Sequence, residues 1–319
     1  MIHHLLVPGL LEASPTGSDF PQLPALELLL SRGDEKPVAD KLEAILFKLF
    51  HLHDQTPAAP YCWLADSGEE ATGWVVQATP VYLRADRDQL LLFELDEGQL
   101  TLEDAQTHAA AFNAHFAEDG LVLEVVSSLR WYLFAAKPVQ VSFSHLSDVA
   151  GHSVGAFMPR GQDAAYWAGI INETQMLFFQ LAENREAEAS GGVPVSGLWF
   201  SGAGTLPLER PVAPAVVEGE DCLLAGLEKH ALEKDERQAL HYFGGIARAQ
   251  RRQDARYWQQ TLAELDQKLS RLMNDGEALC LYAGSGKAYY WTKHMRYRLW
   301  RSKQRFKTIL AERENGEQV

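Results

Sequence analysis

The sequence has 319 residues, of which 46% are hydrophobic, 10% aromatic and 23% charged, a composition that excludes a disordered or fibrous chain. Its 29 Lys and Arg against 43 Asp and Glu give a formal net charge of −14, and a field of that sign disfavours nucleic-acid and membrane partners. Because the sequence shows neither a basic leader nor an apolar run of about 18 residues, we expect a cytoplasmic protein.

The opening block, residues 1–68, is predicted to begin with a short buried strand. Its apolar residues run into the Pro8-Gly9 turn, and a later apolar set recurs at the spacing of a helix. A Pro, Ser and Gly-rich stretch between them is typical of a loop. The segments expected are a strand over 5–7, a loop over 14–24 and a helix over 38–50.

The middle block, residues 69–192, is predicted to be an α+β domain. Several β-like segments alternate with two helical patterns. Thr101-Leu102-Glu103-Asp104 has the form of a capping box, which satisfies the free amides at the start of a helix. The strands expected are 73–77, 81–84, 90–94, 121–125, 129–135 and 139–143, and the helices expected are 101–117 and 163–180.

The last block, residues 193–319, is predicted to add an α/β layer. An apolar run over 195–200 ends on Ser201-Gly202-Ala203-Gly204, and a second one over 278–282 ends on Gly284-Ser285-Gly286. Both have the pattern of a buried strand that leads into a glycine loop. Helices are expected between them, over 221–233, 235–249 and 255–273, and strands separated by helices indicate an α/β sheet.

The segment from Lys293 to Lys307 reverses the charge of the chain. It holds seven Lys and Arg and no acidic residue. One interpretation is a solvated surface that pairs with the acidic remainder of the protein. The other is a patch for a protein or anionic partner, because Tyr297, Trp300 and Phe306 are interleaved with the cations.

A serine-hydrolase motif is also present. Gly151-His152-Ser153-Val154-Gly155 matches G-x-S-x-G, which would place Ser153 on a sharp turn between a strand and a helix. The preceding residues are turn-like, and Pro159 and Gly161 interrupt the helix that should follow. A serine esterase that uses Ser153 is therefore kept as a lesser alternative.

A family resemblance rests on several motifs. Ser147-Asp148-Val149-Ala150-Gly151-His152 is similar to the S-D-x-x-x-H segment of the archaeal-type cofactor-independent phosphoglycerate mutases, of the alkaline phosphatase superfamily, in which the His contacts phosphoglycerate. Further segments resemble the strand that opens the inserted domain of these enzymes, their Tyr-Arg strand, and the helix and strand that precede their R-G-A-G loop. These segments are 73–79, 129–132, 171–173, 184–185 and 193–204.

The resemblance implies an α/β fold, with an alkaline-phosphatase-like layered sheet built from residues 1–68 plus 193–319. An inserted α+β domain over 69–192 would interrupt this layer. In the family, two divalent metals held by Asp and His activate a Ser nucleophile and clamp the transferring phosphoryl group. An active relative would therefore need two manganese or zinc ions.

The ligands of those metals are missing from the matching positions. Pro8-Gly9 replaces the Asp-Gly of the first metal position, and Gly284-Ser285-Gly286 replaces Gly-Asp-His. Only His294 resembles the adjacent histidine motif. We therefore predict neither a metal nor any other cofactor, and the same losses resemble the RpfE-type regulatory proteins of proteobacteria.

The leading hypothesis is a degenerate, non-catalytic protein with a regulatory role that binds a small phosphorylated or carboxylated ligand. Arginines suit such a ligand because their guanidinium groups bind anions through charge-assisted hydrogen bonds. The alternative is an active metal-dependent phosphoglycerate mutase or phosphatase. The residues that the resemblance assigns to ligand binding are Arg84, Arg130, Asp148, His152, Asn172, Asn184 and Arg185.

Overall fold

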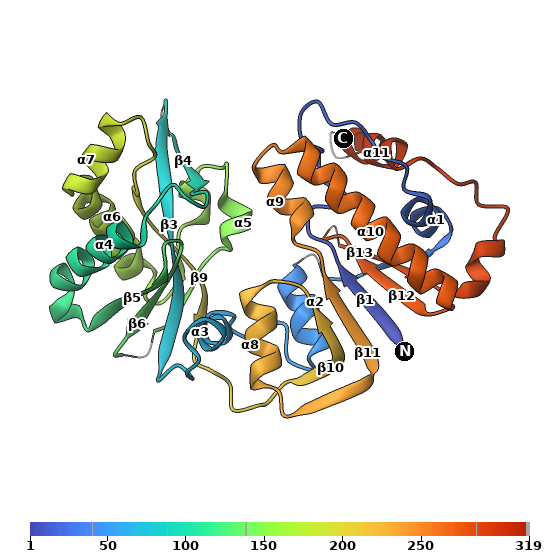
Figure 1. Ribbon diagram of the computed structural model, residues 1–319. Coiled ribbons are helices and arrows are strands. Elements are labelled where there is room, and N and C mark those ends of the chain that lie inside the picture. The colour runs from blue at the N-terminus through green and yellow to red at the C-terminus, as the bar shows by residue number, and fades with distance from the viewer. Residues whose placement is uncertain (40, 88, 138, 285, 317–319) are drawn as a thin grey trace. The chain divides into compact units, whose positions relative to one another are not determined.

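The computed structural model describes residues 1–39, 41–87, 89–137, 139–284 and 286–316. The chain divides into two compact units, one of Met1–Thr56 with Glu209–Val319 and the other of Pro57–Leu208. Most of their helices and strands are labelled in Figure 1. Within those described ranges, no helix is long and apolar enough to cross a bilayer.

The unit formed by the two ends of the chain holds a mixed six-stranded sheet in the order β10-β11-β1-β12-β13-β2. The first four strands in this order are parallel, and β13 and β2 are antiparallel to their neighbours. The predicted α/β class is thus confirmed. The strands are β1 (Ile2–Leu6), β2 (Asp34–Pro37), β10 (Val212–Glu218), β11 (Glu233–Tyr242), β12 (Ala278–Tyr282) and β13 (Lys287–Trp291).

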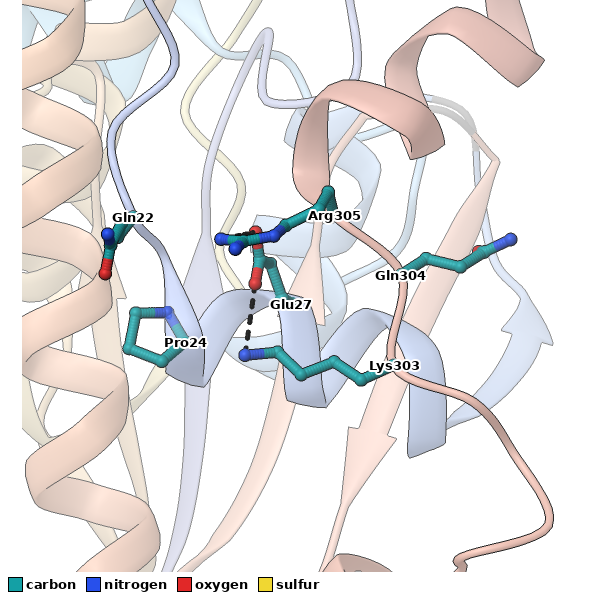
Figure 2. Close-up of a pocket in the computed structure, with 6 residues that line it drawn as sticks. All are labelled: Gln22, Pro24, Glu27, Lys303, Gln304 and Arg305. Atoms are coloured by element: carbon teal, nitrogen blue, oxygen red, sulfur yellow. Dashed lines mark ion pairs between the residues drawn. The ribbon is translucent and has the colours of Figure 1, made fainter.

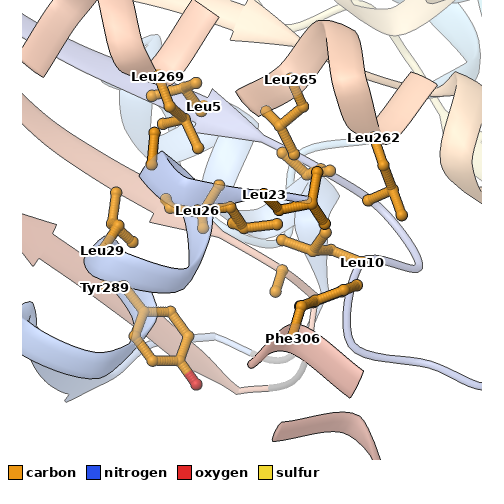
Figure 3. Packing of buried hydrophobic residues seen from close by; sticks show 14 of the residues in the cluster. Leu5, Leu10, Leu23, Leu26, Leu29, Leu262, Leu265, Leu269, Tyr289 and Phe306 are labelled. Carbon is orange, nitrogen blue, oxygen red and sulfur yellow. The ribbon is translucent and has the colours of Figure 1, made fainter. Parts of the chain in front are cut away.

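Helix α10 forms much of the core of this unit because its apolar residues recur every three or four positions. It begins where the Asp254 side chain accepts from Tyr257 N at 2.9 Å, and it ends at Gly276 with φ +81°. Figure 3 shows its leucines gathered with those of α1 and with Leu5 of β1. The helices of this unit are α1 (Pro24–Arg32), α2 (Leu42–Leu49), α8 (Cys222–His230), α9 (Gly245–Arg251), α10 (Ala255–Asp275) and α11 (Phe306–Gly316), with the 3-10 turn η3 (Lys293–Tyr297).

Helix α1 begins without a side-chain cap of its own at Leu23. Asp266 of α10 takes that role, because its Oδ1 accepts from Ala25 N at 2.9 Å and from Leu26 N at 2.8 Å. The Asp266 side chain is buried, and burial raises the pKa of its carboxyl group. The carboxylate therefore ties the start of α1 to α10.

We expect Asp266→Ala to lower the free energy of unfolding by about 2 kcal/mol, because it leaves two buried amides without an acceptor. Asp266→Asn keeps one side-chain oxygen as an acceptor and should cost less. The exposed Gln267→Ala on the same helix is the control. Urea denaturation followed by circular dichroism measures all three, and equal losses for Asp266→Ala and Gln267→Ala would contradict this role.

The unit Pro57–Leu208 is built on antiparallel strands around the long strand β3. One edge of β3 pairs with β9, and the other pairs first with β6 and then with β4, while β5 continues from β6. The strands are β3 (Trp74–Asp86), β4 (Gln89–Glu94), β5 (Leu121–Ser127), β6 (Arg130–Ala135) and β9 (Gly197–Gly204), with the short pair β7 (Val141–Ser142) and β8 (Arg160–Gly161). The helices are α3 (Ala59–Ser67), α4 (Leu102–His115), α5 (Leu146–Val149), α6 (Ala164–Phe179) and α7 (Ala182–Ala189), with 3-10 turns η1 (Ala117–Asp119) and η2 (Val154–Phe157).

The two strands expected over 73–77 and 81–84 form one continuous strand, β3, which contains Pro80. The position of Pro80 explains why the strand is not interrupted there. The backbone carbonyl of Val81 faces the β9 edge of the strand, because it accepts a hydrogen bond from Ser196 N at 2.9 Å. The nitrogen of the preceding Pro80 then faces the other edge, between the last pair with β6 at Gln77 and the first pair with β4 at Val81. The amide hydrogen that proline lacks is not needed there.

Two expectations for the last block are corrected. The strand over 195–200 exists as β9, but it pairs with β3 in the antiparallel sheet and does not belong to the α/β layer. The helix expected over 235–249 is instead strand β11 followed by helix α9, because β11 pairs between β1 and β10 in the parallel part of the six-stranded sheet.

The compact units change at 56/57 and 208/209, because both α3 and β9 contact β3. The predicted boundaries were 68/69 and 192/193.

Candidate functional site

A cavity of about 750 Å³ lies within the unit Pro57–Leu208, where the end of β3 meets α6 and α7. One face of α6 forms its floor, because Asn172, Gln175, Met176 and Phe179 are spaced at i, i+3, i+4 and i+7. Two of these side chains are apolar and yet exposed, Met176 by 62% and Phe179 by 75%. The cavity is lined by Tyr82, Leu83, Arg84, Ala85, Asn172, Gln175, Met176, Phe179, Gln180, Asn184, Arg185, Glu188, Pro194 and Ser196.

Two arginines give this cavity its positive charges. The guanidinium carbon of Arg84 lies 4.7 Å from the centroid of the Phe93 ring, a cation–π contact that restrains it. One Nη of Arg185 donates to Gln180 O at 2.7 Å. Both residues are exposed, so their remaining donors face solvent or a ligand. Glu188 adds one negative charge to the lining.

Asn184 shapes the wall of the cavity rather than its open surface. It is 6% exposed, and its Nδ2 donates to Phe178 O and Val195 O at 2.8 Å each. Its Oδ1 accepts from Val195 N at 2.9 Å and faces His108 Nε2 at 3.2 Å. These four contacts fill the hydrogen-bonding capacity of an amide.

The structure thus brings four of the seven predicted ligand residues, Arg84, Asn172, Asn184 and Arg185, to one cavity. Arg130 lies apart from this lining and donates to Asp66 Oδ1 at 2.6 Å. Tyr132 OH donates to the other oxygen of Asp66 at 2.6 Å, and burial raises the pKa of this phenol. Arg130 therefore joins β6 to α3 through an ion pair.

Asp148 lies in the short helix α5, and His152 follows three residues after that helix ends. Their segment is held against β4, because Leu92 N donates to His152 O at 3.2 Å and Gly151 N donates to Leu92 O at 2.7 Å. The His152 ring is exposed, with Nδ1 3.1 Å from Ala150 O. Neither side chain lines the cavity.

Ser153 lies between α5 and the 3-10 turn η2, with φ −71°. A nucleophile elbow needs a buried strand before the serine and a helix after it. The described residues on either side of Ser153 form a short helix and a 3-10 turn instead, and no strained backbone conformation occurs at this position.

The positions that hold metals in the resembled family lie in the other unit, at the ends of β1 and β12. At Gly9 a Cβ would meet Gln250 Oε1 at 2.1 Å, and Gln250 Nε2 donates to Gly9 O at 2.7 Å. Neither Pro8 nor Gly9 carries a side-chain oxygen or nitrogen that could bind a metal. Ser285 of the second segment lies outside the described residues. Among the described ones, no three His, Cys, Asp or Glu form a group that could hold a metal ion, so these residues do not fit two divalent metals.

A second cavity, of about 310 Å³, lies beside α1 and is lined by Gln22, Pro24, Glu27, Lys303, Gln304 and Arg305. Figure 2 shows Lys303 and Arg305 directed toward Glu27, from which they lie 3.0 and 3.9 Å away. Phe306 N also donates to this buried carboxylate at 3.2 Å. The charges of this cavity therefore largely satisfy one another.

Much of the basic segment 293–307 is likewise paired within its own unit. Arg298 forms a bidentate pair with Asp34, and Arg301 donates to Gly33 O at 2.7 Å. The apolar side chains of Tyr297, Leu299 and Trp300 remain exposed by 67, 76 and 79%. These contacts match the interpretation of a surface that pairs with acidic residues, and a partner at this segment stays a prediction.

No family model matches the sequence, and no curated protein matches it. Among solved structures, the chain is similar to the cofactor-independent phosphoglycerate mutase from Thermoplasma acidophilum DSM 1728, with 13% identity, a TM-score of 0.38, and coverage of 91% of this chain and 89% of that one. It is also similar to the PH0037 protein from Pyrococcus horikoshii, with 10% identity, a TM-score of 0.45, and coverage of 91% and 87%. The relation to these proteins is a distant structural one.

Proposed function

We propose that the protein binds a small phosphorylated or carboxylated ligand in the cavity between β3, α6 and α7 and serves a regulatory rather than a catalytic role. The observation that carries this proposal is the lining of that cavity, in which Arg84 and Arg185 present guanidinium donors beside the amide of Asn172. Guanidinium groups bind carboxylate and phosphate oxygens through paired, charge-assisted hydrogen bonds.

The same lining favours binding over turnover. Catalysis by nucleophilic attack needs an activated hydroxyl or thiol beside a base or a metal. The hydroxyls at the cavity belong to Tyr82 and Ser196. Among the described residues that line it, Glu188 is the one carboxylate, and there is no His, Lys or Cys. The resembled enzymes use metal ions for this step, and the donor set described above does not fit them.

Isothermal titration calorimetry with 3-phosphoglycerate and with inorganic phosphate tests the proposal. We expect binding to the wild type and a loss of about tenfold or more in affinity for Arg185→Ala, because a charge-assisted hydrogen bond contributes roughly 1.5–3 kcal/mol. The matched control is Arg160→Ala, an exposed arginine of the same unit outside the cavity. Absent heats, or equal affinities in all three proteins, would refute this ligand site.

Metal-supported turnover is the second readout. Wild-type protein incubated with manganese or zinc and 3-phosphoglycerate should form no product above a buffer blank. A chelator-sensitive mutase or phosphatase activity would contradict the non-catalytic role, whatever the calorimetry shows.

A further inference from the structure

The cavity in the unit Pro57–Leu208 is larger than a three-carbon phosphorylated acid requires. Its volume of about 750 Å³ lies in the upper part of the range of about 300–1,000 Å³ that holds drug-sized ligands. A ligand of phosphoglycerate size would leave most of this space to water. The size of the cavity therefore points to a bulkier anion.

The floor of the cavity indicates what the bulky part of that anion is. Met176 and Phe179 lie one helical turn apart on α6 and leave 62% and 75% of their surfaces exposed, which is unusual for large apolar residues on a helix whose opposite face is buried. Tyr82 adds an aromatic ring to the lining. Aromatic and thioether groups make favourable contacts with flat rings.

The polar groups around this floor suit the edge of a nitrogenous ring. Asn172, Gln175 and Gln180 bring amides that both donate and accept hydrogen bonds, the pairing pattern that reads the edge of a nucleobase. Base–aromatic stacking contributes roughly 1–3 kcal/mol per base. Both kinds of contact are available along one face of α6.

The charges limit how many phosphates the ligand carries. Arg84 and Arg185 supply two positive charges, and Glu188 subtracts one. The formal charge of the whole chain, −14, further disfavours a polyanion. A single phosphate fits this balance better than a triphosphate.

Resting on the ligand site proposed above, we infer that this cavity takes a nucleoside monophosphate, with its base on Met176 and Phe179 and its phosphate toward Arg185. Calorimetric titration of the full chain with AMP, GMP, CMP and UMP, with ribose 5-phosphate and with adenosine tests it. We expect at least one nucleotide to bind ten times or more tighter than ribose 5-phosphate. Phe179→Ala should remove that difference and leave ribose 5-phosphate binding unchanged, whereas Arg185→Ala should weaken both.

The fully exposed Leu208→Ala, in the same unit but outside the cavity, is the control and should bind as the wild type does. Equal affinities for the nucleotides and for ribose 5-phosphate would overturn the inference and leave the proposed anion site standing. No binding of any phosphate compound would overturn both, and an unchanged preference in Phe179→Ala would refute the placement of the base.

Discussion

Asn184→Ala is expected to destabilise the unit Pro57–Leu208 by about 4 kcal/mol, because each buried polar group left without a partner costs roughly 1–3 kcal/mol. The substitution removes the donors to Phe178 O and Val195 O and the acceptor for Val195 N. Water cannot easily replace them, since Asn184 is 6% exposed. The loss should appear as a lower urea midpoint with a nearly unchanged slope.

The control for this substitution is Asn172→Ala, on the exposed surface of α6 at the same cavity. We expect it to change the free energy of unfolding by less than about 0.5 kcal/mol, as exposed positions usually do. The two variants therefore separate a residue that builds the cavity from one that is available to a ligand. A wild-type midpoint for Asn184→Ala would show that its four contacts contribute little.

Local patterns identified the elements whose signals lie within the element itself. Helix α10 was predictable because its buried side chains recur every three or four residues, and α4 was predictable because Thr101 caps it, with Asp104 N donating to the Thr101 hydroxyl at 3.1 Å. The predicted α/β class is confirmed, although only β12 of the two buried strands that indicated it lies in the six-stranded sheet.

The elements that were missed depend on residues far away in the sequence. Helix α1 follows a Pro-rich loop and has no cap of its own, and the cap comes from Asp266. Strand β11 begins with an exposed charged run resembling a solvated helix face, and only Ala239, Leu240 and His241 are buried. Its strand conformation comes from pairing with β1 and β10.

The candidate site was predictable only in part for the same reason. The resemblance assigned Arg84 and Arg185 to ligand binding, and both line one cavity. It also assigned Arg130, whose partner Asp66 comes from α3. Met176 and Phe179 were missed because α6 is apolar on most of its surface. Its sequence cannot show which apolar residues are buried and which are exposed.

His4 is expected to make the unit with the six-stranded sheet sensitive to acid. Burial lowers the pKa of His4 to about 4, with smaller effects from His3 and His241, and its Nδ1 lies 3.1 Å from Tyr282 OH. In the unfolded chain the pKa returns to about 6.5. Below that pH the unfolded state takes up a proton that the folded state does not.

The stabilisation from neutral His4 is therefore complete above about pH 6.5 and is lost as the pH falls toward 4. Its size is at most about 3.4 kcal/mol, for a shift of about 2.5 pKa units at 1.36 kcal/mol per unit. Urea denaturation of the wild type and of His4→Gln at pH 7.5 and pH 4.5 measures it. The variant keeps a polar group for Tyr282 OH and cannot be protonated, so its loss of stability between the two pH values should be smaller by about that amount.

The exposed His53→Gln controls for the removal of one histidine and should show the wild-type pH dependence. Burial also lowers the pKa values of His3 and His241, which lie 3.0 Å apart through their ring nitrogens. His4→Gln should therefore remove only part of the acid sensitivity of the wild type. An unchanged difference between pH 7.5 and pH 4.5 in that variant would mean that His4 does not contribute to it.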